Sequence, residues 1–325
     1  MMKFFDISEK AAKMRAFNIY IGGRGIGKTY SAITYIMEKG EPFIYLRNTD
    51  VQIKESCTDF GNPFKTWSRD HGRDISIRMQ GKHAIVQERN GDELPTTIGY
   101  AAALSTAGNL RGVDLSDVTT ILFDEFIEKT PLKFQQFDAL MQFYETVSRN
   151  RELLGRDPLR VIMLSNAQKL DNDILYAFDL IPIIEGMIRS GQQDYSRDAI
   201  YLSLPKSEIS EAKKNTAAYI AANKTKFYKE AIQNEFANDN FVGIGVQPLR
   251  EYRGIWKFDD VYIYKHKSAA RYYCCGSRCE NVPEYNSRVP YMFIRYVAPK
   301  LARAYANNNL YFSDFVTKNK IVAYF

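Results

Sequence analysis

Cysteine, histidine and long apolar runs are all scarce in this chain of 325 residues, which has 4 cysteines and 3 histidines. So few cysteines in so long a chain do not form the disulfide framework of a small secreted domain, and we interpret them as reduced thiols. Three of them lie within CCGSRC, but a closed zinc site needs about four ligands and the nearest histidine, His266, is alone. We therefore expect ordinary strand or loop cysteines there.

No apolar run approaches the roughly 18 residues that a membrane-spanning helix needs. The first segment, MMKFFDISEKAAKMR, is too densely charged to hold the apolar stretch of a secretory signal. These absences predict a protein that contacts no membrane and stays in the cytoplasm in which it is made.

The composition is that of a folded globular protein, with 45% hydrophobic and 25% charged residues. The formal net charge of +6 is unevenly distributed. From residue 241 onward there are 13 Lys and Arg against 6 Asp and Glu, whereas the first 240 residues are almost neutral. A basic C-terminal region favours a phosphate-rich partner, although solvated surface lysines and arginines would give the same balance.

Short apolar runs that end in glycine or in polar residues predict buried strands. These strands span residues 17–21, 42–47, 119–123 and 160–164. Helical spacing predicts helices at 28–38 and 131–147, and turn signals predict an antiparallel insertion formed by 74–79, 83–89 and 96–100. The pattern predicts an α/β fold with a mostly parallel central sheet, whose strands deliver their polar ends to one crevice.

The C-terminal half has a different pattern. Residues 207–238 are rich in Ala, Lys and Glu and predict a helical linker. Beyond it, 253–258 and 261–266 predict a hairpin, 291–297 a further strand and 298–305 a helix. The length of the chain also favours two domains.

The segment GGRGIGKT fits the pattern G-x-x-x-x-G-K-[S/T] and lies between an apolar strand and an amphipathic helix. In such a loop the glycines let backbone N–H groups turn toward phosphates, Lys28 reaches the β- and γ-phosphates, and Thr29 ligates Mg²⁺. The alternative is a plain glycine-rich turn before a helix, which the full motif and its flanks disfavour. We predict that the whole loop binds ATP, through Gly22, Gly23, Arg24, Gly25, Ile26, Gly27, Lys28 and Thr29.

Asp124 and Glu125 directly follow an apolar run in TILFDE. Two carboxylates at the end of a strand can serve a magnesium ion and an attacking water, respectively. Acidic pairs after a strand are more often solvated turns, but the glycine loop upstream favours the functional interpretation. An activated water favours hydrolysis over transfer of a phosphoryl group to a small molecule.

Polar residues beyond the acidic pair are further candidates for contacts with the nucleotide phosphates. Ser165 and Asn166 end the next predicted strand, where they could sense the γ-phosphate or form a plain turn. Arg149 and Arg151, in VSRNRE, could place a guanidinium on a transferring phosphate, in the same subunit or in a neighbour. On composition alone, both would be interpreted as ordinary surface arginines.

Taken together, GGRGIGKT, TILFDEFIE, SRNRE and RVIMLSNA resemble the DNA-packaging ATPases of phi-twenty-nine-like podoviruses, an encapsidation-protein family related to the large terminases. The similarity returns in KLARAYANNNLYF and is weaker between Asn234 and Tyr264. Arg24 in the loop, and Arg111 with Gly112 ahead of the acidic strand, are features shared with terminase motors. Arg111 falls where the family has a basic residue at the subunit interface.

The resemblance also implies roles for the other motif residues. Lys28 and Thr29 match the Walker A pair, Asp124 the magnesium aspartate and Glu125 the catalytic glutamate. Arg149 resembles the trans-acting arginine finger of the family.

Partners are likewise implied by the resemblance. Family motors are homo-oligomeric, pentameric rings that use ATP and Mg²⁺ to drive double-stranded DNA through a viral portal into a procapsid. The expected location is therefore the host cytoplasm, with transient attachment to the procapsid. Some relatives also use a packaging RNA, and the sequence leaves open whether this chain does.

We therefore predict three parts: a P-loop ATPase domain of the additional-strand, RecA- or terminase-like type at 1–205, a helical linker at 206–240, and a smaller domain at 241–325. For the last part the resemblance implies an RNase H-like fold, which acts as a two-metal nuclease in large terminases. The acidic candidates for such a site are few, namely Asp259, Asp260, Glu284 and Asp314. We expect no nuclease activity here.

The C-terminal domain is instead expected to contact nucleic acid or the portal. Its candidate contact residues are Arg271, Tyr272, Tyr273, Arg278, Arg288, Arg295 and Lys300, unless the aromatic residues are structural. Two other functions stay open on the sequence. One is a helicase or a terminase with active cleavage, and the other is a nucleotide-binding adaptor that scaffolds nucleic acid without mechanical work.

Overall fold

A computed structural model of the chain describes residues 4–81, 83–110, 114–128, 132, 134–166, 170, 172–205, 208–213, 215–221 and 243–325. The chain divides into two compact units, residues 1–174 with 185–237 and residues 175–184 with 238–325. Much of the predicted linker at 206–240 lies outside the described residues. The predicted domain boundaries therefore stay a prediction.

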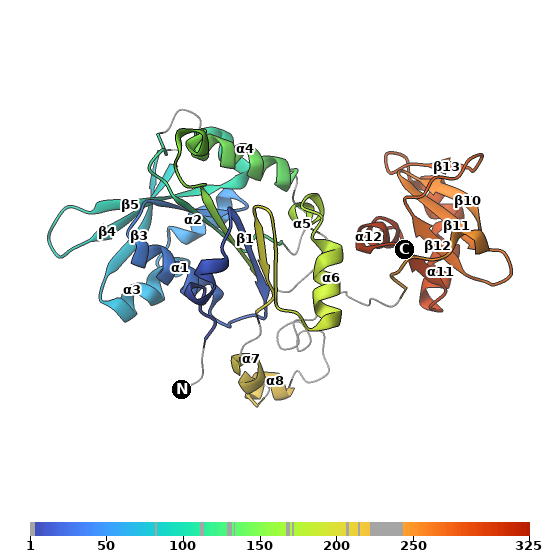
Figure 1. Ribbon diagram of the computed structural model, residues 1–325, viewed down its shortest axis with the longest axis horizontal. Coiled ribbons are helices and arrows are strands. Elements are labelled where there is room, and N and C mark those ends of the chain that lie inside the picture. The colour runs from blue at the N-terminus through green and yellow to red at the C-terminus, as the bar shows by residue number, and fades with distance from the viewer. Residues whose placement is uncertain are drawn as a thin grey trace. The chain divides into compact units, whose positions relative to one another are not determined.

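Within the described residues, the first unit contains a nine-stranded sheet in the order β3-β4-β5-β2-β6-β7-β1-β9-β8 (Figure 1). Its strands are β1 (Phe17–Gly22), β2 (Phe43–Arg47), β3 (Asp74–Gln80), β4 (His83–Arg89), β5 (Thr96–Ala103), β6 (Thr120–Asp124), β7 (Arg160–Asn166), β8 (Asp194–Arg197) and β9 (Ile200–Ser203). The run from β5 to β9 in this order is parallel, and β3–β4, β4–β5 and β8–β9 are antiparallel. The prediction of a mostly parallel α/β sheet is confirmed.

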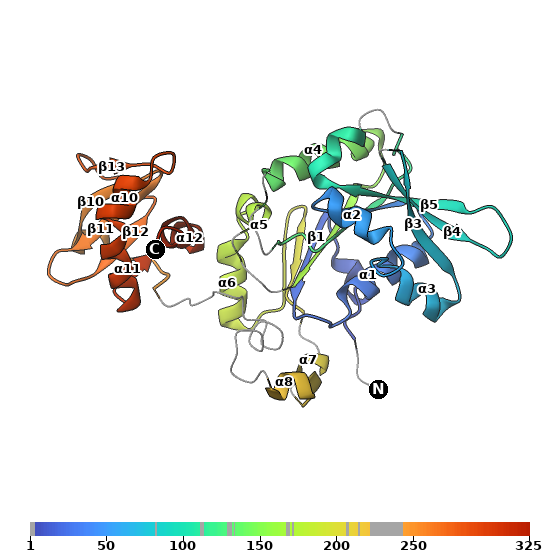
Figure 2. The ribbon, with the colours of Figure 1, turned by 180° about the vertical axis from the view of Figure 1, so that it is seen from behind.

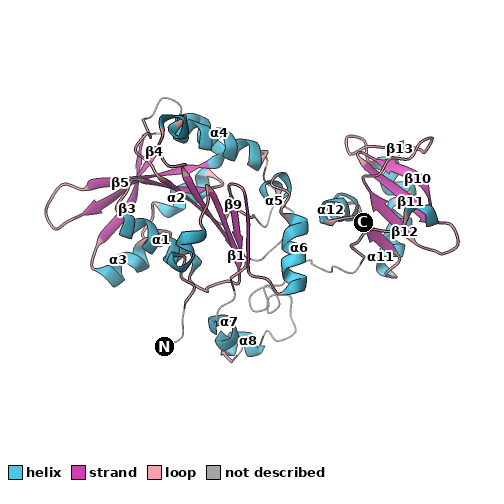
Figure 3. Ribbon diagram, viewed as in Figure 1, coloured by secondary structure: helices cyan, strands magenta, loops and turns pink. Residues whose placement is uncertain are grey.

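Helices lie between successive parallel strands along the chain, whereas β3 to β5 and β8 to β9 follow one another without a described helix between them (Figure 3). The α-helices are α1 (Lys28–Lys39), α2 (Asp50–Ser56), α3 (Lys65–His71), α4 (Gln136–Ser148), α5 (Asp173–Ala177), α6 (Ile181–Ser190), α7 (Glu208–Lys213) and α8 (Ala217–Ala221). Short 3₁₀ helices are η1 (Ser8–Lys13), η2 (Leu104–Leu110) and η3 (Arg151–Leu154).

The two faces of β1 pack against different helices. Tyr20 belongs to the apolar core that also contains Ile33 and Ile36 of α1. Phe17 points to the other face of the strand and packs against Tyr144 of α4, with the rings tilted and 5.0 Å between their centroids. Because helices cover both faces, the central strands β6 and β7 are almost wholly buried and read as continuous apolar runs.

The second unit has its own sheet, in the order β13-β10-β11-β12-β14 within the described residues. Its elements are η4 (Leu249–Glu251), β10 (Tyr252–Phe258), β11 (Val261–His266), β12 (Tyr272–Cys275), β13 (Glu284–Tyr285), α10 (Tyr291–Tyr296), α11 (Ala298–Ala306), β14 (Leu310–Phe312) and α12 (Phe315–Val322). A separate core joins Phe258, Phe293, Leu301 and Phe312, each at most 2% exposed. The predicted hairpin is confirmed as β10–β11, and the RNase H-like assignment stays a prediction.

Two sequence predictions for this unit are wrong. The segment 291–297 contains helix α10 and no strand, because Phe293 and Val297 lie one helical turn apart and both face the core. The intervening Ile294 and Tyr296 are exposed, a pattern that alternation along a strand would not give. Tyr273 is only 3% exposed and packs in a tyrosine cluster, so it is a structural residue and not a contact residue.

All four cysteines are free thiols in the structure, and Cys274 and Cys275 are buried in β12. A helix long and apolar enough to cross a membrane is not found among the described residues.

An ionic cluster fastens the N-terminal segment to the edge hairpin β8–β9. The Asp194 carboxylate accepts hydrogen bonds from Lys10 (3.0 Å), Lys13 (2.9 Å), Tyr201 (2.8 Å) and Ser203 (2.9 Å). Partial burial raises the pKa of Asp194, but these hydrogen bonds outweigh it and hold the pKa well below its usual range. The cluster positions η1, and with it the chain that leads into β1.

We predict that Asp194→Asn lowers the free energy of unfolding at pH 7 by about 2 kcal/mol, because the amide cannot replace a charge that two lysines bind. A carboxylate with a depressed folded-state pKa contributes fully above its unfolded pKa of about 4, and this contribution is lost as the pH falls below that value. Urea unfolding of wild type and variant at pH 7 and at low pH measures the difference.

The matched control is Asp198→Asn in the same hairpin, where the side chain is 89% exposed and should contribute little. A destabilisation by Asp194→Asn that is equal at both pH values would contradict the prediction.

Candidate phosphate-binding site

The glycine loop follows β1 and ends where α1 begins. Gly25 and Gly27 have φ angles of 70° and 97°, which side-chain-bearing residues rarely adopt. A Cβ atom on Gly27 would also lie 3.1 Å from the ring of Phe4, in the N-terminal segment. Glycine is therefore required at both positions for this loop conformation.

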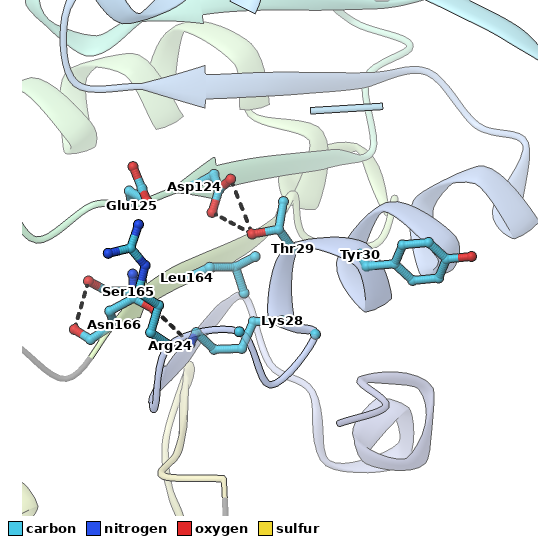
Figure 4. A pocket seen from close by; sticks show the side chains of 11 residues that line it. Arg24, Lys28, Thr29, Tyr30, Asp124, Glu125, Leu164, Ser165 and Asn166 are labelled. Atoms are coloured by element: carbon cyan, nitrogen blue, oxygen red, sulfur yellow. Dashed lines mark hydrogen bonds between the residues drawn. The ribbon is translucent and has the colours of Figure 1, made fainter. Parts of the chain in front are cut away.

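Lys28 begins α1 and turns back over the loop. Its Nζ donates to the carbonyl oxygens of Gly22 (3.0 Å) and Gly23 (2.8 Å) and to Oδ1 of Asn166 (3.1 Å; Figure 4). The residue is 7% exposed, and burial lowers the pKa of its ammonium group to about 8 against the opposing charge of Asp124. Such a cation is better stabilised by an anionic partner than by carbonyl dipoles.

Thr29 and Asp124 form the other side of the site. The threonine hydroxyl donates to both carboxylate oxygens, at 3.1 and 3.3 Å (Figure 4), and the hydroxyl of Tyr45 lies 3.5 Å from one of them. Asp124 is 5% exposed, and burial raises the pKa of its carboxyl group. A buried carboxylate beside a hydroxyl is an all-oxygen donor set, which fits the preference of Mg²⁺.

Glu125 follows Asp124 in a left-handed backbone conformation, with φ of 52°. The turn takes its side chain away from the buried strand, so the side chain is 53% exposed at the rim of the site. There it accepts a hydrogen bond of 2.7 Å from Nη2 of Arg47, at the end of β2. The two adjacent carboxylates therefore occupy different environments, one buried and one open to solvent.

These groups surround a cavity of about 270 Å³. It is lined by Arg24, Gly25, Gly27, Lys28, Thr29, Tyr30, Asp124, Glu125, Leu164, Ser165 and Asn166 (Figure 4). Ser165 is buried and donates to the Asn166 carbonyl at 3.2 Å. The carboxyl ends of β1, β6 and β7 thus bring together most of the residues that the sequence singles out.

Of the predicted arginines, Arg24 lines the cavity, whereas Arg149 and Arg151 lie elsewhere. Arg149 caps the C-terminal end of α4, is 44% exposed and forms an ion pair with Asp114 at 3.2 Å. Arg151 donates to the carbonyl oxygen of Val118 at 2.6 Å. Neither lines the cavity, and Arg111 and Gly112 fall outside the described residues.

A buried amide pair behind the acidic residues is absent from the sequence predictions. Nδ2 of Asn48 donates to the carbonyl oxygens of Glu125 (3.1 Å) and Phe126 (3.3 Å). Nε2 of Gln136 donates to Oδ1 of Asn48 and to the carbonyl oxygen of Phe126, both at 2.6 Å. Asn48 directly follows the strand predicted at 42–47, so the rule that selected the other strand-end residues would also have found it. Gln136 carries no such signal.

Lys213 of α7 is a second residue without a sequence signal. Its Nζ donates to the carbonyl oxygen of Arg24 at 2.6 Å. The lysine therefore contacts the glycine loop from a helix far away in sequence.

The family model described as Podovirus DNA encapsidation protein (Gp16) matches residues 2–251, well over half of the chain. The chain belongs to this family. The resemblance predicted from the motifs is confirmed.

Individual proteins similar to this chain support the same family membership. The DNA packaging protein of Bacillus phage B103 is 28% identical over 238 residues, which cover 71% of this chain and 67% of that protein. The DNA packaging protein of Bacillus phage phi29 is 26% identical over 249 residues, covering 74% and 68%. The solved bacteriophage Phi-29 viral genome packaging motor assembly aligns with a TM-score of 0.64 at 20% identity, over 99% of this chain and 97% of that one. At that identity the structural likeness shows a shared fold.

We predict that Gln136→Met lowers the free energy of unfolding by about 2 kcal/mol. The substitution removes the hydrogen bond to Oδ1 of Asn48 and the shorter of the two hydrogen bonds to the Phe126 carbonyl. Chemical denaturation measures the loss. The matched control is Gln142→Met on the same helix, where the side chain is exposed. Equal stabilities of the two variants would contradict the proposed energetic role of the amide pair.

Proposed function

We propose that this chain is the ATP-hydrolysing subunit of a motor that packages double-stranded viral DNA into a procapsid. The main support is the convergence of Lys28, Thr29, Asp124 and Glu125 on one cavity at the carboxyl edge of the sheet. Membership of the DNA encapsidation family supplies the biological context.

In the proposed site, Lys28 binds the β- and γ-phosphates, and the loop presents its backbone N–H groups to the same anion. Thr29 and Asp124 would hold Mg²⁺, which when bound neutralises charge on the phosphates. The hydrogen bonds from Thr29 to Asp124 already bring the two side chains together. Burial of Asp124 excludes water from that side of the site.

Glu125 is proposed to orient and deprotonate the attacking water. Its carboxylate lies at the open rim of the cavity, where water has access, and its backbone is held by Asn48. In this structure the carboxylate is directed to Arg47, so it must exchange that partner for water before it can act as a base. Asn166 is proposed to respond to the γ-phosphate, and its hydrogen bond to Lys28 supports this role.

Arg149 is proposed to act in trans, on the phosphates bound by a neighbouring subunit of a ring. It does not line the cavity of its own subunit, and its guanidinium is partly exposed at the end of α4. Engagement of a neighbour would require the ion pair with Asp114 to open. A finger supplied in trans makes hydrolysis depend on the adjacent subunit. Arg111 is proposed to lie at the same interface.

The C-terminal unit is proposed to contact nucleic acid or the portal. Its candidate contact residues, apart from Tyr273, are partly or fully exposed, with Tyr272 stacked on Trp256 at 6.2 Å between centroids. Lysine and arginine would bind phosphates there without reading base sequence, which suits a motor that must accept any DNA.

Nuclease activity is not proposed, because the candidate acids have structural roles. Asp260 pairs with Lys320 at 2.8 Å, and Asp314 caps α12 by accepting from the backbone N–H of Thr317 at 2.8 Å. Asp259 accepts from the backbone N–H of Ser287 at 3.0 Å in a left-handed turn.

We predict that Glu125→Gln lowers kcat for ATP hydrolysis by at least about a hundredfold while nucleotide binding persists, because the amide cannot take a proton from water. Steady-state phosphate release and binding of a fluorescent nucleotide give the two quantities. Glu38→Gln, an exposed position on α1, serves as the control. Unchanged turnover in Glu125→Gln would contradict the assignment of Glu125 as the catalytic base.

The wild-type rate of ATP hydrolysis should rise with double-stranded DNA or assembled capsid partners. A rate that does not rise would favour the adaptor function instead.

For Arg149, we predict that Arg149→Ala subunits and Glu125→Gln subunits are each inactive alone but partly active when mixed on procapsids. In the mixed ring, an intact site on one subunit can face an intact arginine on the next. The rate of ATP hydrolysis as a function of mixing ratio is the measurement. An absence of recovery at every ratio would indicate a role in cis or a structural role.

A further inference from the structure

The chain returns to the glycine loop after its last described strand in the first unit. Strand β9 pairs in parallel with β1, so both strands end at the same edge of the sheet. Pro205, two residues beyond β9, packs against the loop, since a Cβ atom on Gly22 would lie 3.1 Å from its ring. Figures 1 and 2 both show α7 beside the connection between β1 and α1.

Lys213, the last residue of α7, ends on this loop. Its Nζ donates to the carbonyl oxygen of Arg24 at 2.6 Å, and a Cβ atom on Gly25 would lie only 2.5 Å from the same nitrogen. Two separate points of the segment after β9, Pro205 and Lys213, therefore rest on the glycine loop.

Three cations thus gather around one short loop: Arg24, Lys28 and Lys213. Burial and the charge of Arg24 lower the pKa of Lys213, and the charge of Lys213 in turn contributes to the lowered pKa of Lys28. The carboxylates of the site face Thr29 and Arg47. The ammonium group of Lys213 donates a hydrogen bond to a carbonyl oxygen, which compensates a buried charge less well than an anion does.

We propose that Lys213 is a third phosphate-binding cation beside Arg24 and Lys28. Its ammonium group exchanges the Arg24 carbonyl oxygen for a phosphate oxygen when the nucleotide binds. The position of α7 then depends on whether a triphosphate is present. This rests on the proposed nucleotide site. Lysine suits the role, because its ammonium is a mobile point charge on a flexible stem. Helix α7 precedes the C-terminal unit in the chain, so the contact would report nucleotide occupancy to the segment that leads there.

The test compares binding of ATPγS and ADP to the full chain by fluorescence titration. Lys213→Gln should weaken ATPγS binding about tenfold. It should weaken ADP binding less, because attraction to a point charge grows with the charge of the ligand. Lys213→Arg should retain most of the affinity. The matched control is Lys54→Gln on α2, a lysine with a 63% exposed side chain, which should change neither affinity.

Hydrogen exchange gives an independent readout. In the wild type, ATPγS should slow exchange of the backbone amides at 208–213 more than ADP does, and Lys213→Gln should abolish that difference. A purely structural role would weaken both nucleotides equally and leave no nucleotide-dependent protection of α7, which would overturn the proposal. Unchanged affinities in Lys213→Gln would do the same. If the wild type binds neither nucleotide, the proposed function itself fails, so the two failures are distinguishable.

Discussion

Backbone hydrogen bonds between the parallel strands β6, β7 and β1 set where the side chains of the candidate phosphate-binding site lie. Their register pairs Gly22 with Asn166, and Asp124 with Leu164. The glycine loop, the acidic pair and the polar end of β7 therefore leave the sheet at one edge. Because all three strands are buried on both faces, a shift in register would expose apolar side chains as well as dismantle the site. Function and core packing thus depend on the same constraint.

Burial sets the pKa shifts of two charged side chains in the site. Lys28 and Asp124 are both nearly inaccessible to solvent. Burial lowers the pKa of Lys28 and raises that of Asp124, which in both cases favours the neutral form. A nucleotide with its metal ion brings charges of both signs and would stabilise both side chains, so the cost of burying them favours ligand binding. Glu125 differs because the left-handed turn after Asp124 carries it out of this environment. One strand end thereby supplies two carboxylates suited to different tasks.

The two units illustrate different ways of using aromatic residues. In the first unit, rings such as Tyr20 fill the space between helix and sheet. In the second, Phe258 and Phe293 pack with their rings tilted, at 4.1 Å between centroids, in a separate core. Tyr291 and Tyr296 remain exposed beside Arg295. An independent core lets the second unit keep its own fold without contributions from the first.

The sequence by itself determined the parallel α/β sheet, the glycine loop and the acidic pair, because these depend on local patterns: apolar runs, glycines that permit left-handed backbone, and polar residues at strand ends. It failed at 291–297, where apolar composition does not distinguish a short helix from a strand until Phe293 and Val297 have a core to face. Only the tertiary structure decided that Arg47 meets Glu125, that Asn48 and Gln136 hold the backbone behind it, and that Lys213 rests on the loop. These contacts join residues far apart in the chain. The accepting groups are backbone carbonyls, a carboxylate and a side-chain amide oxygen, which many other positions could equally supply. No local pattern specifies which donor meets which acceptor. The packing of helices against the sheet determines it.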